Sequence, residues 1–198
     1  MPYLIRRPRP RRLVCAAASA LALAAALPAA AAACTVSTAS ETQAFAHYGD
    51  SSWYTLAPGG SFVSSAPGWT LTHTTIQNGG SSFPDALTIA PNGTAITAPI
   101  CVSSETPTFR FFGRQDGGYY AEVNVNVLWT NTNGQAEDVT AGGGNVGSSW
   151  APSGVYDLGA MLPTESGNTF SVRLQFIPAS TGGAVQIDDL YVDPYSRT

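Results

Sequence analysis

The sequence predicts an all-β fold, an antiparallel β-sandwich that begins after Cys34. From Cys34 onward, apolar residues almost never recur at helical spacing. Short runs rich in Val, Ile, Phe, Tyr, Trp and Thr are instead separated by clusters of Gly, Pro, Asn and Ser at near-regular intervals, a pattern typical of sandwiches and barrels. The last such run, residues 185–192, changes its apolar phase midway, which favours a closing strand that carries a β-bulge.

Residues 1–33 have the composition of a secretory signal peptide. A basic head contains Arg11-Arg12, an Ala/Leu run spans 13–27, and the small residues 31–33 precede Cys34. A transmembrane anchor is the alternative, but the apolar run is short for one. The arginine pair also suggests twin-arginine export, although the match after it is only partial, so general secretion is favoured. We therefore expect a secreted, extracellular protein with one folded domain, residues 34–198.

Removal of the signal peptide changes the charge balance of the chain. Five of its nine arginines lie in residues 1–33, and the sequence contains no lysine. The mature chain thus has four arginines against thirteen acids, a formal charge of −9. Nucleic acids and anionic membrane surfaces bind clustered Lys and Arg, so neither is an expected partner.

Two cysteines remain after cleavage, Cys34 and Cys101. In an exported chain a single disulfide between them is the simplest prediction. Closing a loop of this length should stabilise the fold by about 4 kcal/mol in the chain-entropy model. A lipidated Cys34 is the alternative, but Ala31 stands where such signals favour a branched aliphatic residue.

The pattern of apolar runs and turns predicts the following elements. A hairpin is expected around Pro91-Asn92-Gly93 and a flexible loop at glycines 142–144. Phe and Val alternate with polar residues most clearly in 119–130 and 170–177, and Trp69 is large enough to anchor the core. The expected strands or strand-like segments are 42–48, 52–56, 68–72, 86–90, 95–100, 108–112, 119–130, 137–141, 150–156, 170–177 and 185–192.

The final strand contains an adjacent acid pair at its change of phase. Val185 and Ile187 share one face of an extended chain, whereas Leu190 and Val192 share the other. A β-bulge at Asp188-Asp189 would keep both halves against a core and re-aim a carboxylate that otherwise lacks a partner.

Two stretches together resemble the ends of galactose-binding-like jelly rolls. These are Gly59-Gly60-Ser61-Phe62 with the following Pro67-Gly68-Trp69-Thr70-Leu71, and Gln186-Ile187-Asp188-Asp189-Leu190-Tyr191-Val192. Such folds occur as carbohydrate-binding modules of secreted bacterial hydrolases and as free-standing exported proteins without known function. The resemblance implies a jelly-roll β-sandwich and a non-enzymatic role.

The same resemblance suggests a structural calcium ion as a cofactor. It places Asp189 at the position of a C-terminal ligand. The N-terminal acidic ligand usually follows the Phe of the first motif, where this chain has Val63. Because calcium requires six to eight oxygen ligands, this departure weakens the expectation, and the alternative is an acid pair that accepts backbone hydrogen bonds.

Catalytic patterns in the sequence are weak, and no enzyme activity is expected. Gly49-Asp50-Ser51 is similar to the Gly-Asp-Ser block of secreted esterases, but no histidine follows His73 to serve as the base near the C-terminus. His47 and His73 lack the spacing of a metal site. Thirteen acids leave a glycosidase carboxylate pair open, because spacing alone does not decide it.

A polar sheet face is the strongest functional signal. If the Phe, Val and Leu residues of three strands face the core, Arg110, Asn124, Asn126, Arg173 and Gln175 face outward. Planar amides and guanidinium groups suit sugar hydroxyls and carboxylates. Aromatic residues at the rim would add stacking platforms: Trp53, Tyr54, Tyr119 and Tyr120.

The hypothesis is therefore an exported module that binds carbohydrate or another cell-envelope ligand through this polar face. The simplest alternative is that the polar residues are only the solvated side of a sandwich. A structural or protein–protein interaction module without a small-molecule site is the second hypothesis, and a secreted hydrolase the third.

Overall fold

The computed structural model describes residues 40–103, 108–131, 133–158 and 169–193. All of them fall within one compact unit, Ala31–Thr198. The expected signal peptide and Cys34 lie outside the described residues, so the cleavage site and the disulfide remain predictions. No helix in these described ranges is long and apolar enough to cross a membrane.

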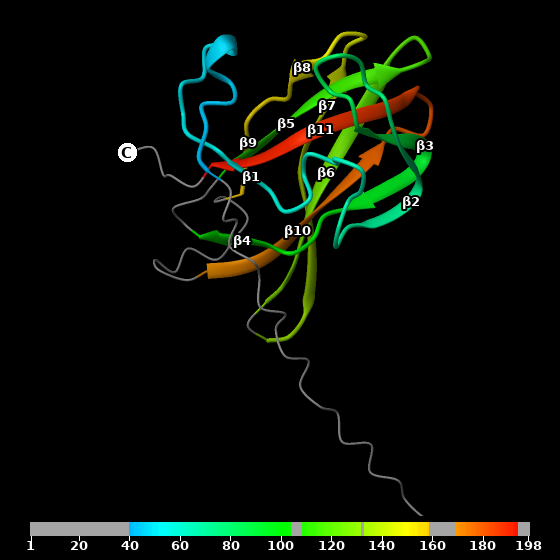
Figure 1. Cartoon of the computed structure of the whole chain (residues 1–198). Helices are drawn as coiled ribbons and strands as arrows, with labels where there is room; N and C mark the ends of the chain where they lie inside the picture. The colour runs from blue at the N-terminus through cyan, green and yellow to red at the C-terminus, as the bar shows by residue number, and fades with distance from the viewer. Residues whose placement is uncertain (1–39, 104–107, 132, 159–168, 194–198) are drawn as a thin grey trace, which may run out of the picture. The chain divides into compact units, whose positions relative to one another are not determined.

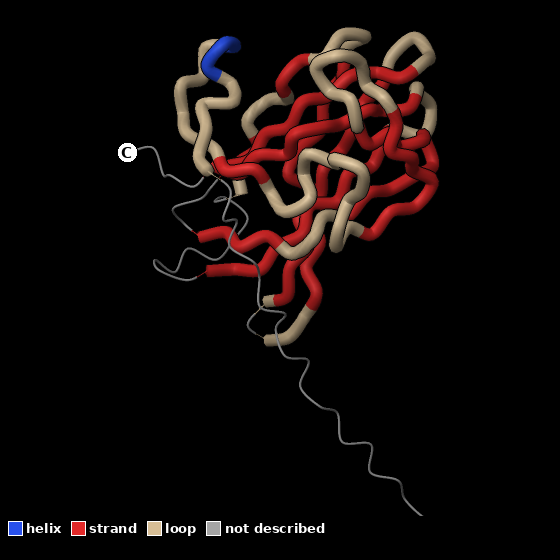
Figure 2. Tube along the Cα trace, viewed as in Figure 1, coloured by secondary structure: helices blue, strands red, loops and turns tan. Residues whose placement is uncertain are grey.

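The described chain is built almost entirely of strands (Figure 2). Its one helical element is the single-turn 3-10 helix η1 (Ala46–Tyr48). The strands are β1 (Thr55–Leu56), β2 (Thr70–Gln77), β3 (Ala86–Ile96), β4 (Ile100–Ser103), β5 (Thr108–Asp116), β6 (Ala121–Thr130), β7 (Ala136–Val146), β8 (Ala151–Pro152), β9 (Tyr156–Asp157), β10 (Thr169–Pro178) and β11 (Ala184–Asp193).

The strands form one curled antiparallel sheet that folds over itself into two layers (Figure 1). The order is β7-β6-β10-β3-β11-β5-β8, with β4 added to β10, β1 to β11, β2 to β3 and β9 to β5. We call β7, β6 and β10 the front layer, and the first half of β3 with β11 and β5 the back layer. Their outward surfaces are the front face and the back face. The predicted all-β antiparallel sandwich is confirmed.

The core lies between the two layers and follows the two-residue alternation of the strands. All eight residues expected to face the core are at most 1% exposed, and they belong to one apolar cluster. Trp69 closes one end of it, with its ring nitrogen donating to the Pro58 carbonyl at 3.0 Å. The eight residues are Phe109, Phe111, Val123, Val125, Val127, Val172, Leu174 and Phe176.

Strand β3 is bent where a hairpin was predicted, so that prediction is wrong. Residues 86–96 form one continuous strand through Pro91-Asn92-Gly93. Its first half pairs with β11, and its second half pairs with β10. A β-carbon at Gly93 would lie 2.7 Å from the His73 carbonyl oxygen, so only glycine permits this approach of β2. The bend carries β3 from one layer to the other.

The three glycines expected in a loop lie inside β7 instead. Gly142 pairs with Val125, and a β-carbon there would come within 3.3 Å of the Tyr156 ring. That ring stacks on Phe109, with the ring centroids 4.9 Å apart. Gly142 therefore makes room for an aromatic side chain that closes the side of the sandwich. This contact comes from the tertiary structure and could not be predicted from the local sequence.

The predicted β-bulge in the last strand is confirmed. The pairing of β11 with β5 shifts register between Asp188 and Tyr191, and Asp189 has a φ of 47°. The bulge places Leu190 in the core. Backbone hydrogen bonds join Leu190 to Gly60 and to Ala57, which ties the first described strand segment to the last strand.

Candidate functional site

The front face brings four of the five predicted binding residues together on two neighbouring strands. Asn124 and Asn126 lie on β6, whereas Arg173 and Gln175 lie on β10. In the strand register Gln175 is opposite Asn126, and Arg173 is opposite Leu128. All four side chains are half-buried on the side away from the core.

These residues are arranged in three rows that cross the strands. One row is Arg173, Leu128 and Asp138; the next is Gln175, Asn126 and Thr140. The third row joins Ile177 and Asn124 to Gly143. Neighbouring rows are about 7 Å apart, because each is two residues further along an extended strand. The front face thus combines polar groups with the apolar side chains of Leu128 and Ile177.

Strand β7 positions the two asparagines. The Thr140 hydroxyl donates to Asn126 Oδ1 at 3.1 Å. The side chain of Asn124 reaches across to Gly143, where a β-carbon would collide with its Oδ1 atom. A glycine at this position therefore leaves space for the Asn124 amide to lie across the strand.

Two hollows, each of about 500 Å³, lie at opposite ends of the three rows. The first is lined by Arg173, Leu128 and Asp138, and also by Trp129 and Phe170. The indole nitrogen of Trp129 is buried and has no hydrogen-bond partner in the described chain. The second hollow is lined by Asn124 and Ile177, with Asn92, Thr94 and Thr181 on its walls.

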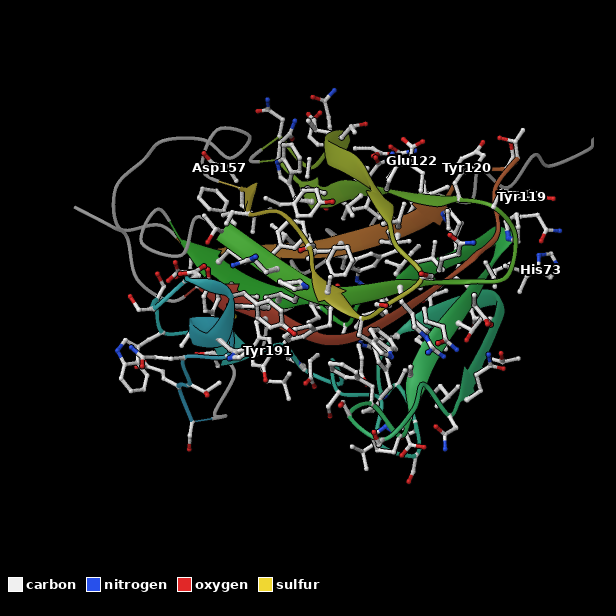
Figure 3. The ribbon with its side chains drawn as sticks, turned by 90° about the horizontal axis from the view of Figure 1, so that it is seen from above. His73, Tyr119, Tyr120, Glu122, Asp157 and Tyr191 are labelled. Carbon is white, nitrogen blue, oxygen red and sulfur yellow. The ribbon has the colours of Figure 1, made fainter. Side chains whose placement is uncertain are left out.

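Tyr120 contacts a residue that lines the second hollow. The hydroxyl groups of Tyr120 and Thr181 are hydrogen-bonded at 2.8 Å, and Thr181 lines the hollow. Tyr119 is fully exposed. Figure 3 shows Tyr119, Tyr120 and Glu122 on the same side of the molecule. The other two aromatics expected at the rim lie on the N-terminal segment: Trp53 is exposed, but Tyr54 is buried.

Arg110 is separate from the other four predicted residues because it lies in an ion pair on the back face. Its Nη1 atom is 2.8 Å from Asp50 Oδ2, and its Nε and Nη2 donate to the Ser153 carbonyl. The guanidinium also lies 4.4 Å from the centroid of the Phe45 ring. Only 8% of the residue is exposed, so the expected outward, solvent-facing position is wrong. The alternation was right, but the N-terminal segment covers this side.

The covering segment, residues 42–56, is anchored by Asp50 and Tyr54. The Tyr54 hydroxyl donates to Asp50 Oδ2 at 2.6 Å. Burial and this hydrogen bond raise the pKa of Tyr54 to about 12. Burial would also raise the pKa of Asp50, but hydrogen bonds from Tyr54, Ser52 and Arg110 outweigh it and hold that pKa well below its usual value. Asp50 is therefore held as an anion that ties the segment to Arg110.

Aromatic side chains complete the cover of the back face. Phe45, Phe83 and Phe112 pack together, with Trp150 against Phe83 at 4.4 Å between centroids. Figure 3 shows Tyr191 beside the N-terminal segment, and its ring centroid is 5.6 Å from that of Phe45. Beneath this cover, polar groups are already paired: Arg114 donates to Gln186, and Gln186 donates to Thr88. The back face is thus occupied by the protein's own side chains.

The sequence did not point to Leu128, Asp138 or Thr140 as members of the face. Asp138 and Thr140 lie on β7, which the sequence predicted only as a short separate strand, 137–141. The Asn-Gly turn after residue 130 is the sequence signal from which their position on the front face could have been predicted. Because a tight turn pairs the strands on either side, it would have placed these two side chains beside those of β6.

The described residues do not fit the calcium site that the resemblance raised. No group of three or more His, Cys, Asp or Glu that could hold a metal ion occurs within them. Val63, which stands where an acidic ligand was expected, is 66% exposed and offers no side-chain oxygen. Burial raises the pKa of Asp189, and it raises that of Asp188 to about 7. The Asp189 backbone N–H donates to Asp188 Oδ1 at 2.7 Å, as in the alternative reading of the acid pair.

No family model and no curated protein matches this sequence. Solved structures of similar fold include the CBM22-1 xylan-binding domain of Paenibacillus barcinonensis Xyn10C, with a TM-score of 0.50 and 12% identity over 66% of this chain and 88% of that one. The chain shares the jelly-roll fold of carbohydrate-binding modules. The C-terminal family 22 module of Clostridium thermocellum Xyn10B has the same TM-score and identity, covering 72% of this chain and 98% of that module.

A third jelly-roll structure, the tandem CBM22-1–CBM22-2 domain of P. barcinonensis Xyn10C, has a TM-score of 0.52 at 11% identity and covers 73% of this chain and 44% of that one. The resemblance noted at the two ends of the sequence is thereby confirmed at the level of the fold. Identities of 11–12% establish the jelly roll and no more.

Proposed function

We propose that the protein is an exported, non-enzymatic module that binds carbohydrate on its front face. Three jelly rolls of similar fold are described as xylan-binding domains or carbohydrate-binding modules. The resemblance in the sequence points the same way. Neither relation names a ligand for this chain, so the proposal depends on the chemistry of its own surface.

The single observation that carries the proposal is the difference between the two outer faces. The back face is covered by residues 42–56 and by Phe83 and Trp150. The front face instead exposes planar amides and a guanidinium in rows, with a hollow at each end. Sugars present hydroxyl groups that both donate and accept, which matches side-chain amides. Apolar patches between polar groups, here Leu128 and Ile177, suit the carbon faces of sugar rings.

Binding of soluble polysaccharides tests this proposal. The mature protein is run in native gels that contain one neutral or acidic polysaccharide each, and mobility is compared with a gel without glycan. We expect retardation by at least one of them. The double variant N124A/N126A should weaken this interaction at least tenfold, since each amide contributes on the order of 1 kcal/mol.

A matched control separates loss of binding from loss of folding. Gln77→Ala removes an exposed amide on β2 that bonds to Asp116, away from the front face. It should bind like the parent, and all three proteins should melt at similar temperatures. If no polysaccharide retards the protein, the carbohydrate proposal is wrong and the interaction-module hypothesis takes its place.

A further inference from the structure

The geometry points to a ligand class: the front face binds polysaccharides that carry carboxylate groups, and Arg173 is the residue that holds the carboxylate. This inference rests on the proposed carbohydrate-binding function and specifies its substrate. The observation that supports it is the difference in bonding between Arg173 and the other described arginines.

Arg173 differs from the two other arginines that the structure describes. The Arg110 guanidinium is bound by Asp50 and Ser153. The Arg114 guanidinium is bound by Gln186, and its Cζ atom lies 5.3 Å from the centroid of the Trp150 ring. Arg173 is half-buried, yet within the described ranges no carboxylate forms an ion pair with it. A guanidinium stays charged at any physiological pH and has five donors in a planar fork. Since Arg173 lines the hollow, its guanidinium can pair with a ligand bound there.

The row that contains Arg173 has the dimensions of a sugar subsite. Arg173, Leu128 and Asp138 lie side by side on three adjacent strands, and all three line the hollow. The backbones of the outer two strands are about 10 Å apart, twice the spacing between neighbouring strands. A sugar ring fits over Leu128 with its carboxylate on Arg173 in a bidentate pair, while its hydroxyls donate to Asp138.

The acids near the hollow form no ion pair with Arg173 in the described chain. They would instead fix the orientation of the bound sugar. Glu137 accepts a hydrogen bond from Asn131 at 2.7 Å. Asp138 also lines the hollow, but it lies two strands from Arg173. Since the mature chain is strongly acidic, it has no general attraction for polyanions. Recognition of an acidic glycan then depends on this one guanidinium.

The experiment compares acidic polysaccharides with their carboxyl-reduced forms, which differ only in the charged group. Glucuronoxylan, polygalacturonate and alginate are each titrated into the mature protein by isothermal calorimetry at 0.15 M salt, in native and reduced form. The polysaccharide that binds should bind about tenfold to a hundredfold more tightly than its reduced form, because hydrogen bonds to charged groups exceed neutral ones by this margin.

Three variants identify the residue responsible. Arg173→Gln should remove the difference between native and reduced glycan, Arg173→Lys should retain part of it, and Asn124→Ala should weaken both forms alike. Equal affinity for native and reduced glycans, or a difference that persists in Arg173→Gln, overturns the inference and leaves the carbohydrate proposal standing. Absence of binding to every native, reduced and neutral polysaccharide overturns both.

Discussion

Asp188 is a buried carboxylate whose ionisation is unfavourable in the folded state. It is 3% exposed, and burial raises its pKa to about 7, helped by the nearby charges of Asp189 and Asp85. The hydrogen bond from the Asp189 backbone partly opposes this shift. Burial, with the charges of Asp189 and Asp188 contributing, also raises the pKa of Tyr191 to about 12. The bulge therefore concentrates negative charge where solvation is poor.

This arrangement predicts a pH-dependent cost of folding. Well below pH 4 Asp188 is protonated in both the folded and unfolded states. As the pH rises from about 4 to about 7, the unfolded chain releases the proton while the folded chain retains it, so the free energy of unfolding falls. The loss is on the order of 4 kcal/mol by linkage.

The variant Asp188→Asn tests this prediction. Asparagine keeps the oxygen that accepts from the Asp189 backbone and carries no charge. In buffer with a chelator, the variant should unfold at higher urea than the parent at pH 8 and at similar urea at pH 3.5. The same pH slope in both proteins would show that Asp188 is ionised without cost.

Arg110 shows that the alternation within one strand does not reveal contacts with residues far away in the sequence. The alternation of β5 correctly separated Arg110 from Phe109 and Phe111. It held no information about Asp50, sixty residues earlier, whose carboxylate pairs with the guanidinium. The four other residues were predicted from the clean alternation of β6 and β10 alone, and they lie together because these two strands are neighbours in the sheet.

At the scale of elements, the adjacent glycines of β7 have separate roles. Gly142 faces the Tyr156 ring and has a φ of 148°, whereas Gly143 faces the Asn124 amide. We expect Gly142→Ala to lower the free energy of unfolding by about 1–3 kcal/mol, through backbone strain and displacement of the ring. Gly143→Ala should instead displace Asn124, which weakens glycan binding and changes stability less.

Urea unfolding and glycan titration of both variants check this separation. Each variant serves as the control for the other, since the two substitutions are chemically identical and one residue apart. Similar losses of stability and of binding in both variants would contradict the separate roles.

The bend in β3 could not be predicted from the local sequence. Pro91-Asn92-Gly93 has the composition of a turn, and a turn was predicted. The strand continues because the close approach of β2 at Gly93 and the pairing with both β10 and β11 override the local preference. By contrast, the β11 bulge was predictable, because its signal, the change of apolar phase, lies within a single strand.

For the molecule as a whole, the proposed export predicts a disulfide between Cys34, at the start of the mature chain, and Cys101, in its middle. Cys101 lies in β4, opposite Ser171 of β10. Mass spectrometry of the exported protein should find an N-terminus at Cys34 and a mass two hydrogens below that of the reduced chain. A diacylglycerol on Cys34, or free thiols on both cysteines, would contradict the predicted disulfide.

The pairing of strand β3 with both layers affects how the protein unfolds. Because one continuous backbone segment is hydrogen-bonded into both layers, neither layer can lose its pairing without disturbing the other. We therefore expect the two layers of the sandwich to unfold as a single cooperative unit, the front layer together with the covered back layer.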